Sequence, residues 1–141
     1  MDGVENLKRI LQEQVDSLKD RILAIADYLH QNPELGYAET KACQRLVDEL
    51  EKSGFKVTKG VAGLSTAFKA VLPGESRKPI VGILGEYDAL PEIGHACGHN
   101  LSAASAVGAA MALAKLMPKL PGNLMSRAAP KAVDRLTQAS R

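Results

Sequence analysis

The hydrophobic pattern of the chain changes its period near residue 55, and this change limits the possible folds more than any other feature. From Leu7 to Leu29, apolar residues recur at steps of three and four between charged residues, which predicts one long amphipathic helix. Pro33 ends this helix, because the residue before a proline is disfavoured in the α region. A second helix is expected at residues 38–52.

After residue 55 the pattern is typical of short strands. We expect strands at residues 55–58, 66–72 and 79–84. The last of these is almost entirely apolar, which favours a central strand that is covered on both faces. Residues 73–76 have turn chemistry, so the second and third strands are expected to form an antiparallel pair.

A loop at residues 85–100 and a helix of small residues at 101–116 complete the regular pattern. This order predicts an α/β fold in which helices pack on a mixed sheet, and 141 residues suit one domain. Residues 123–141 fit less well, because they carry four basic residues, one acidic residue, Pro130 and only a weak apolar stripe. A frayed helix and disorder are both open for this tail.

The composition excludes several classes of protein. The chain has 18 Lys and Arg against 16 Asp and Glu, and only 4% aromatic residues, so a basic, ring-lined nucleic-acid platform is not expected. The most apolar stretch contains Lys115 and is too short to span a membrane. The acidic start is unlike a secretory signal, and Cys43 and Cys97 are too few for a disulfide framework. We therefore expect a cytoplasmic protein with free thiols that binds neither nucleic acid nor membrane.

The loop at residues 85–100 holds most of the potential chemistry. It follows the C-terminal end of the third expected strand, where open α/β sheets bind ligands. His95, Cys97 and His99 are spaced two apart, and on an extended backbone this spacing places them on one side. Thiolate and imidazole suit zinc or another late divalent ion. A nucleophilic Cys–His pair is the competing interpretation, and Asp88 taken alone could be a turn residue.

Other potential ligands have simpler explanations. Cys43 lies among apolar residues and is expected in the core. His30 is expected to interact with the C-terminal dipole of the first helix, and Glu34 and Glu39 with the N-terminus of the second.

Three stretches together resemble the aminoacylase/carboxypeptidase-type amidohydrolases, a family of two-metal peptidases and acylases. They are HQNPELG at residues 30–36 followed by Glu39 and Thr40, GEYDALP at residues 85–91, and HACGHN at residues 95–100. The match extends over roughly residues 20–123 in order and spacing. The family includes hippurate and aminobenzoyl-glutamate hydrolases, and the wording of the second motif is similar to that of the Xaa-Arg and β-alanyl-lysine dipeptidase branch.

The resemblance implies a fold, an activity and roles for single residues. Residues 1–122 would be the N-terminal part of a zinc-peptidase-like catalytic domain, and intact relatives hydrolyse peptide or N-acyl amino-acid amide bonds with metal-activated water. Cys97 and His99 would bind a divalent ion (zinc, manganese or cobalt), and Asp88 would orient the site. His95 belongs to the motif but is not normally a ligand, and Asn100 stands where the family often has Asp.

The resemblance also implies that the metal site is incomplete. In the family, the general-base Glu and the remaining ligands follow the position of Asn123, whereas this chain has no His after His99 and only Asp134 as an acidic residue there. We therefore expect a truncated amidohydrolase or dipeptidase with little or no activity alone. The alternative is a non-catalytic chain that binds metal weakly or associates with a homologue, and a homo-oligomer is also open.

Residues 123–141 are assigned to an atypical tail for the same reason. When residues 127–134 are read in a shifted frame, suitable synonymous codons encode a Pro-Glu-Gly-rich run that is similar to a family loop. A frameshift just after Asn123 is therefore a hypothesis, and the coding DNA downstream of this codon tests it.

Overall fold

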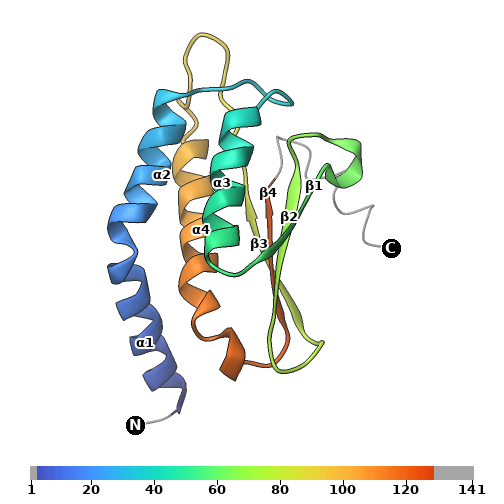
Figure 1. Ribbon diagram of the computed structural model, residues 1–141. Helices are drawn as coiled ribbons and strands as arrows, with labels where there is room; N and C mark the ends of the chain where they lie inside the picture. Colours follow the sequence, from blue (N-terminus) through green and yellow to red (C-terminus); the bar gives the residue numbers. More distant parts are fainter. Residues whose placement is uncertain (1–2, 129–141) are drawn as a thin grey trace.

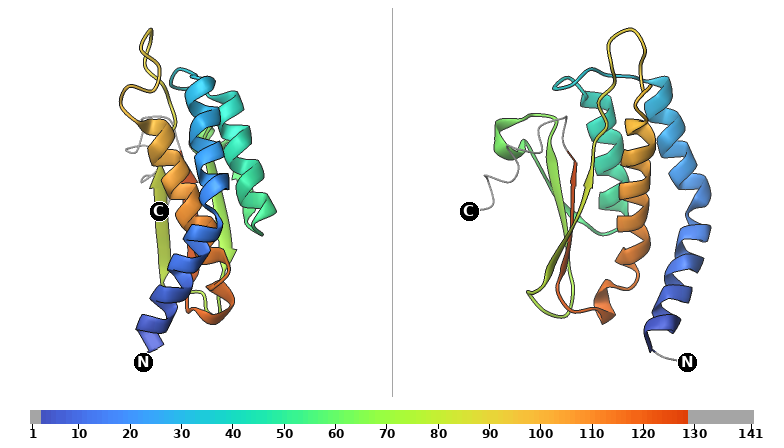
Figure 2. Two further views of the ribbon diagram at one scale, coloured as in Figure 1. Left: turned by 90° about the vertical axis from the view of Figure 1, so that its left-hand side faces the viewer. Right: turned by 180° about the vertical axis from the view of Figure 1, so that it is seen from behind.

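The computed structural model describes residues 3–128, which form two layers, one of helices and one of strands (Figures 1 and 2). The regular elements are, in chain order, α1 (Gly3–Ser17), α2 (Lys19–Gln31), α3 (Thr40–Lys52), β1 (Lys56–Lys59), η1 (Val61–Gly63), β2 (Phe68–Pro73), β3 (Ile80–Gly85), α4 (His99–Ala114), η2 (Met117–Lys119) and β4 (Asn123–Ala128). The predicted class, α/β with helices packed on a mixed sheet, is confirmed.

The sheet has the strand order β1-β2-β4-β3. The β1–β2 and β2–β4 pairs are antiparallel, whereas β3 and β4 run parallel. Helices α3 and α4 lie against one face of this sheet, and α1 and α2 pack on the outer side of α4 (Figure 2). The link from β3 through α4 to β4 is thus the helical crossover that a parallel pair requires.

The predicted single N-terminal helix is two helices. The first ends at Ser17 and the second begins at Lys19, with Leu18 between them. The Ser17 hydroxyl donates a hydrogen bond to the carbonyl of Gln14 at 2.8 Å, and a side chain that bonds to the backbone in this way competes with the helical ladder. The predicted second helix is confirmed, and it begins two residues later, at Thr40.

The predicted antiparallel pair of β2 and β3 is wrong. Strand β4 lies between them and pairs with both. Its residue Ala128 lies opposite Phe68 of β2 on one side and opposite Gly85 of β3 on the other. Residues 123–128 were expected to be a frayed helix or disordered, and this expectation is wrong as well, because they form β4. Residues 129–141 lie outside the described part of the chain, and the division of the chain at residue 122 stays a prediction.

The expectation that β3 is central and covered on both faces is also wrong. Within residues 3–128 it is an edge strand, and Ile80, Val81 and Leu84 are more than half exposed. The prediction failed because an apolar run shows which residues prefer burial but not whether a neighbouring strand exists.

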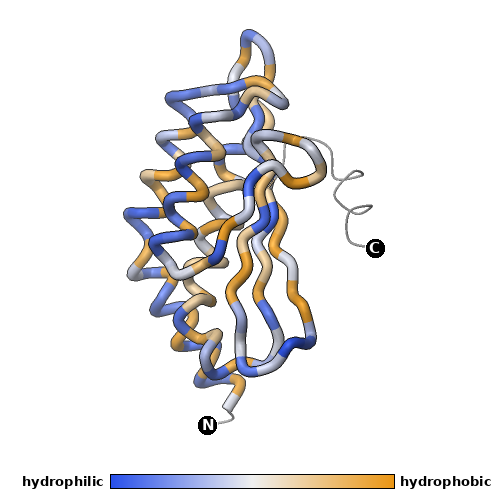
Figure 3. Tube along the Cα trace, turned by 45° about the vertical axis from the view of Figure 1, so that its right-hand side comes forward, coloured by the Kyte–Doolittle hydropathy of each residue, from blue (hydrophilic) through white to orange (hydrophobic). Residues whose placement is uncertain are grey.

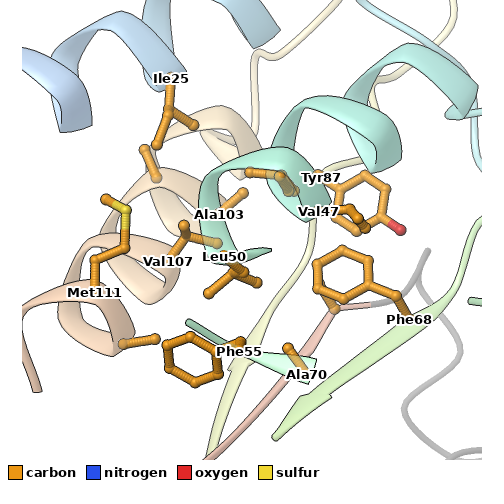
Figure 4. Close-up of a cluster of buried hydrophobic side chains, with 14 of the residues drawn as sticks. Ile25, Val47, Leu50, Phe55, Phe68, Ala70, Tyr87, Ala103, Val107 and Met111 are labelled. Atoms are coloured by element: carbon orange, nitrogen blue, oxygen red, sulfur yellow. The ribbon is translucent and has the colours of Figure 1, made fainter. Parts of the chain in front are cut away.

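The core lies between the helix layer and the sheet. Its largest side chains meet from α2, α3, β2 and α4, together with Phe55 and Tyr87 (Figure 4). Tyr87 and Phe68 are fully buried, with ring centroids 6.2 Å apart. Within residues 3–128, none of the helices has the length and apolarity to cross a membrane.

Candidate metal centre

The loop after β3 carries the candidate residues. Its backbone forms hydrogen-bonded turns and is not extended. Leu90 and Gly94 bond to each other through their main chains, and Gly94 has a φ of +60°. The next turn brings the N–H of Gly98 to the carbonyl of His95 at 2.9 Å, with a φ of +78° at Gly98. Glycine adopts these left-handed conformations without steric cost. Helix α4 begins directly after this turn.

This geometry changes the expected relation between the three spaced side chains. His95 is 8% exposed, whereas Cys97 is an exposed free cysteine. The expectation of an extended segment with His95, Cys97 and His99 on one side is therefore wrong, because residues 95–98 form a turn. Burial lowers the pKa of His95, and its Nδ1 has no hydrogen-bond partner among the described residues.

Asp88 and His99 form the best-defined contact of the site. The Asp88 Oδ1 lies 2.8 Å from the His99 Nδ1, and the Asp88 main-chain oxygen lies 3.1 Å from the same nitrogen. Both oxygens can only accept, so Nδ1 carries a hydrogen, and Nε2 is the ring nitrogen left for another partner. Asp88 is 4% exposed. Its hydrogen bond holds the imidazole in one orientation, as carboxylates do for metal-binding histidines.

Glu86 is a site residue that the sequence reasoning missed. Its Oε2 lies 3.2 Å from the His99 Nε2, so the ring stands between two carboxylates. A signal was available, because Glu86 precedes Asp88 by two positions, and this spacing places two side chains on one side of an extended segment.

The donor types of this loop fit zinc or a similar ion, but their number does not. Cys97 provides a thiol and His99 an imidazole, while a hydrolytic zinc site normally has three protein ligands. Among residues 3–128, no group of three or more His, Cys, Asp or Glu side chains is arranged to hold a metal ion.

Asn100 connects the start of α4 to α2. Its side-chain amide is buried and donates a hydrogen bond to the carbonyl of Ala26 at 3.3 Å. A carboxylate at this position would have to face a carbonyl oxygen, so the amide fits this chain where the family often has Asp.

Glu39, Thr66 and Tyr87 form a buried polar cluster near Asp88. Glu39 is fully buried and accepts hydrogen bonds from the Tyr37 N–H at 2.9 Å and the Thr66 hydroxyl at 2.8 Å. Loss of solvent raises the pKa of Glu39, and the nearby charge of Asp88 adds to this effect. The phenol of Tyr87 donates to the Thr66 carbonyl. The interpretation of Glu39 as a simple helix-terminal charge is therefore incomplete.

Glu34 has the role that its position predicted. Its carboxylate accepts the N–H groups of Lys41 and Ala42 at 3.1 and 2.9 Å, at the N-terminus of α3. The core position predicted for Cys43 is likewise confirmed, since it is 4% exposed, and burial raises the pKa of its thiol.

An apolar pocket of about 340 Å³ adjoins the site. Leu35, Tyr37, Leu90 and Pro91 line it, together with Asp88. Ala89 also lines this pocket, and its N–H donates to the carbonyl of Glu34 at 2.8 Å.

Comparison with known proteins finds similarity to a hydrolase subunit and to a dipeptidase. The chain is 33% identical over 129 residues to a subunit of the p-aminobenzoyl-glutamate hydrolase of Escherichia coli, a match that covers 79% of this chain and 26% of that protein. It is 41% identical over 118 residues to the Xaa-Arg dipeptidase of Mus musculus, which covers 78% of this chain and 27% of the dipeptidase. No family model matches.

The fold has matches among solved structures. A dinuclear metal-binding peptidase of the M20 family from Bacillus subtilis superposes with a TM-score of 0.78 at 24% identity, over 88% of this chain and 40% of that one. The chain thus spans between about a quarter and two-fifths of the length of these proteins. Sequence and fold together relate it to the aminoacylase/carboxypeptidase-type amidohydrolases, and the resemblance to that family is confirmed.

Proposed function

We propose that the chain is part of a metal-dependent amidohydrolase or dipeptidase, and that it has little or no hydrolytic activity by itself. The observation that carries this proposal is the contact between Asp88 and His99 at 2.8 Å. It leaves Nε2 as the metal-binding atom of His99, the first residue of α4, which is held against the loop that follows the C-terminal end of β3, where α/β sheets bind ligands.

Cys97 and His99 would hold the ion, and zinc, manganese and cobalt all accept such ligands. A bound divalent ion polarises an amide carbonyl and lowers the pKa of its water. The role of Asp88 is to keep the His99 ring in one tautomer and orientation. Glu86 contacts the same nitrogen that a metal would take, so it must turn aside or become a ligand itself. Because only two ligands are assigned among residues 3–128, we derive no catalytic step from these residues.

The substrate class is a small peptide or an N-acyl amino acid. The apolar pocket beside Asp88 supports this proposal, because Leu35, Leu90 and Pro91 would receive an apolar side chain or acyl group. A cytoplasmic location and the lack of nucleic-acid and membrane partners stay predictions from the sequence.

Zinc titration of the purified chain, in competition with a chromophoric chelator, tests the site. We expect one weak site per chain, since two ligands provide far less than the ~10–16 kcal/mol of a complete structural zinc site. His99→Ala should abolish binding, and Asp88→Ala should lower the affinity by about 10- to 100-fold. His30→Ala is the matched control, because this histidine is exposed on α2. Equal affinities of the His99 and His30 variants would refute the site.

The activity itself is tested with dipeptides and N-acyl amino acids. The zinc- or manganese-loaded chain should show no hydrolysis above the rate of the free ion. Clear turnover that His99→Ala removes would show that the chain is an active hydrolase and would contradict the proposed inactivity.

A non-catalytic chain that binds metal weakly or associates with a homologue is the second candidate. It is favoured by β3, which within residues 3–128 pairs with a strand on one side only and has exposed apolar residues, since such an edge can pair with another chain. If zinc binding is absent and association is present, this candidate replaces the first.

A further inference from the structure

A second pocket lies in the helix layer, away from the candidate metal centre. It has a volume of about 450 Å³ and is bounded by the junction of α1 and α2 and by the C-terminal ends of α3 and α4 (Figure 1). His99 of the metal centre is the first residue of α4, whereas Lys115 of the pocket follows its last residue. The 16 residues of this helix, at about 1.5 Å per residue, separate the two sites by roughly 24 Å.

The charged side chains that line this pocket all have the same sign. Arg21, Lys52 and Lys115 come from three different helix ends, and none of the described lining residues is Asp or Glu. The whole chain is different, because its 18 Lys and Arg are almost balanced by 16 Asp and Glu. Figure 3 shows hydrophilic and hydrophobic residues alternating along the helices. Charges of one sign that line a hollow attract ions of the other sign.

A single carboxylate is shared by several of these cations. The side chain of Glu49 is 5% exposed, and Arg21 Nε lies 3.0 Å from its Oε2. Arg45 Nη2 and Lys52 Nζ lie 3.4 and 3.8 Å from its Oε1. One negative charge offsets only one of these three positive charges. Lys115 forms no ion pair with any residue in the range 3–128, so a surplus of positive charge remains at the pocket.

The other lining residues favour an organic anion over a bare ion. Met111 is 3% exposed and provides an apolar wall together with Leu18. Glu49 holds the guanidinium of Arg21 through Nε and Nη2, and Nη1 is its remaining donor group. A donor that is already held in place binds with a smaller loss of entropy. Small-molecule sites typically have volumes of about 300–1,000 Å³, apolar walls and a few polar groups, and this pocket has all three properties.

We propose that this pocket binds a small organic anion with two or more negative charges, either a phosphate monoester or a polycarboxylate. Arg21, Lys52 and Lys115 contact its oxygen atoms, and Leu18 and Met111 contact its carbon atoms. Arginine and lysine recognise phosphate and carboxylate groups through the same charge-assisted hydrogen bonds, so the two chemistries are separated by experiment. The pocket contains no residue of the candidate metal centre, and the inference does not depend on the proposed hydrolase function.

Titration of the isotope-labelled full chain with citrate and with glycerol phosphate, followed through its amide NMR signals, tests the site. The ionic strength is kept low because salt screens exposed charges, and glycerol is the uncharged control. We expect shifts that saturate at one site per chain and are largest at the amides of Leu18, Ser53 and Lys115. Saturation with only one of the two anions supports the proposal and identifies the chemistry. The absence of saturable shifts with both anions overturns it, as do equal shifts with glycerol.

Removal of single charges tests the position of the anion. Lys52→Gln and Lys115→Gln should each weaken binding by about three- to tenfold, since each removes one charge-assisted contact at an exposed position. Lys41→Gln is the matched control, because Lys41 is exposed at the opposite end of α3 and its loss changes the net charge equally. Circular dichroism confirms that each variant is folded. Equal affinities of the Lys41 and Lys115 variants would show that the anion responds only to net charge, and would overturn the proposal.

Discussion

At the scale of single residues, the candidate site depends on how two carboxyl groups share a small space. Gly36 lies beside both of them, because a Cβ atom built on it would be 3.9 Å from Asp88 Oδ2 and 4.0 Å from Glu39 Oε1. Asp88 contacts His99, while Glu39 is enclosed by the Tyr37 N–H and the Thr66 hydroxyl. Burial raises the pKa of Glu39, and the nearby charge of Asp88 adds to this effect.

This burial predicts a specific dependence of stability on pH. The folded-state pKa of Glu39 lies above its ordinary value of 4.5, so the folded state binds this proton more tightly than the unfolded state. The contribution of Glu39 is fully present below about pH 4.5 and falls as the pH rises through the raised pKa. The loss is about 1.4 kcal/mol for each unit between the two values.

Glu39→Gln should remove this dependence. Urea unfolding at several pH values between 4 and 7 should give a wild-type free energy that declines relative to the variant. Glu51→Gln, at an exposed position on α3, is the matched control and should follow the wild type. Curves for wild type and Glu39→Gln that remain parallel at all pH values would disprove the effect.

At the scale of elements, the parallel pair of β3 and β4 begins at a close approach of two backbones. The N–H of Asn123 donates to the carbonyl of Pro79 at 2.8 Å. Gly122 has a φ of +89°, and a Cβ atom built on it would lie 2.2 Å from the same oxygen. Only glycine satisfies both the left-handed conformation and the contact.

Gly122→Ala should therefore be severely destabilising, by about 2–4 kcal/mol, because backbone strain and a steric clash add. Gly60→Ala is the matched control. Gly60 has a φ of +74° with no atom within 4 Å of its Cβ position, so only the conformational cost of about 1–2 kcal/mol applies. Urea unfolding measures both. Equal losses would show that the contact with Pro79 contributes nothing.

The sequence was sufficient for the elements whose pattern is local. The apolar stripes of α2 and α3 and the small-residue helix α4 were predicted within a few residues. Strand β4 was not, because its inward residues are Leu124, Ser126 and Ala128, and two of these three have weak or no hydrophobic signal. Its place between β2 and β3 is set by the crossover through α4, which no local pattern shows.

The candidate site was predictable to a similar extent. The motifs indicated Asp88, Cys97 and His99, and the structure brings Asp88 and His99 into contact. The buried environment of Glu39 was not predictable, because its partner Thr66 is 27 positions away in the chain. Glu86 was missed because the family motif gives it no role.

At the scale of the whole molecule, the core and the candidate site are separate. The core fills the space between the helix layer and the sheet along the length of α4 (Figures 2 and 4). The candidate site lies where the loop after β3 meets the first residue of α4. Cys97 is exposed, and it does not belong to the apolar cluster. We therefore expect this chain to fold without the metal.

Removing metal should consequently leave the fold intact. With EDTA, the midpoint of thermal unfolding should shift by less than about 2 °C and the transition should stay cooperative, because a weak site adds little free energy. Zinc at ten times its dissociation constant should stabilise the chain by about 1.4 kcal/mol, and Cys97→Ser should abolish this gain. Circular dichroism at increasing temperature measures both effects. Loss of the cooperative transition in EDTA would mean that the metal holds the fold together, and the apolar core could then not be its main source of stability.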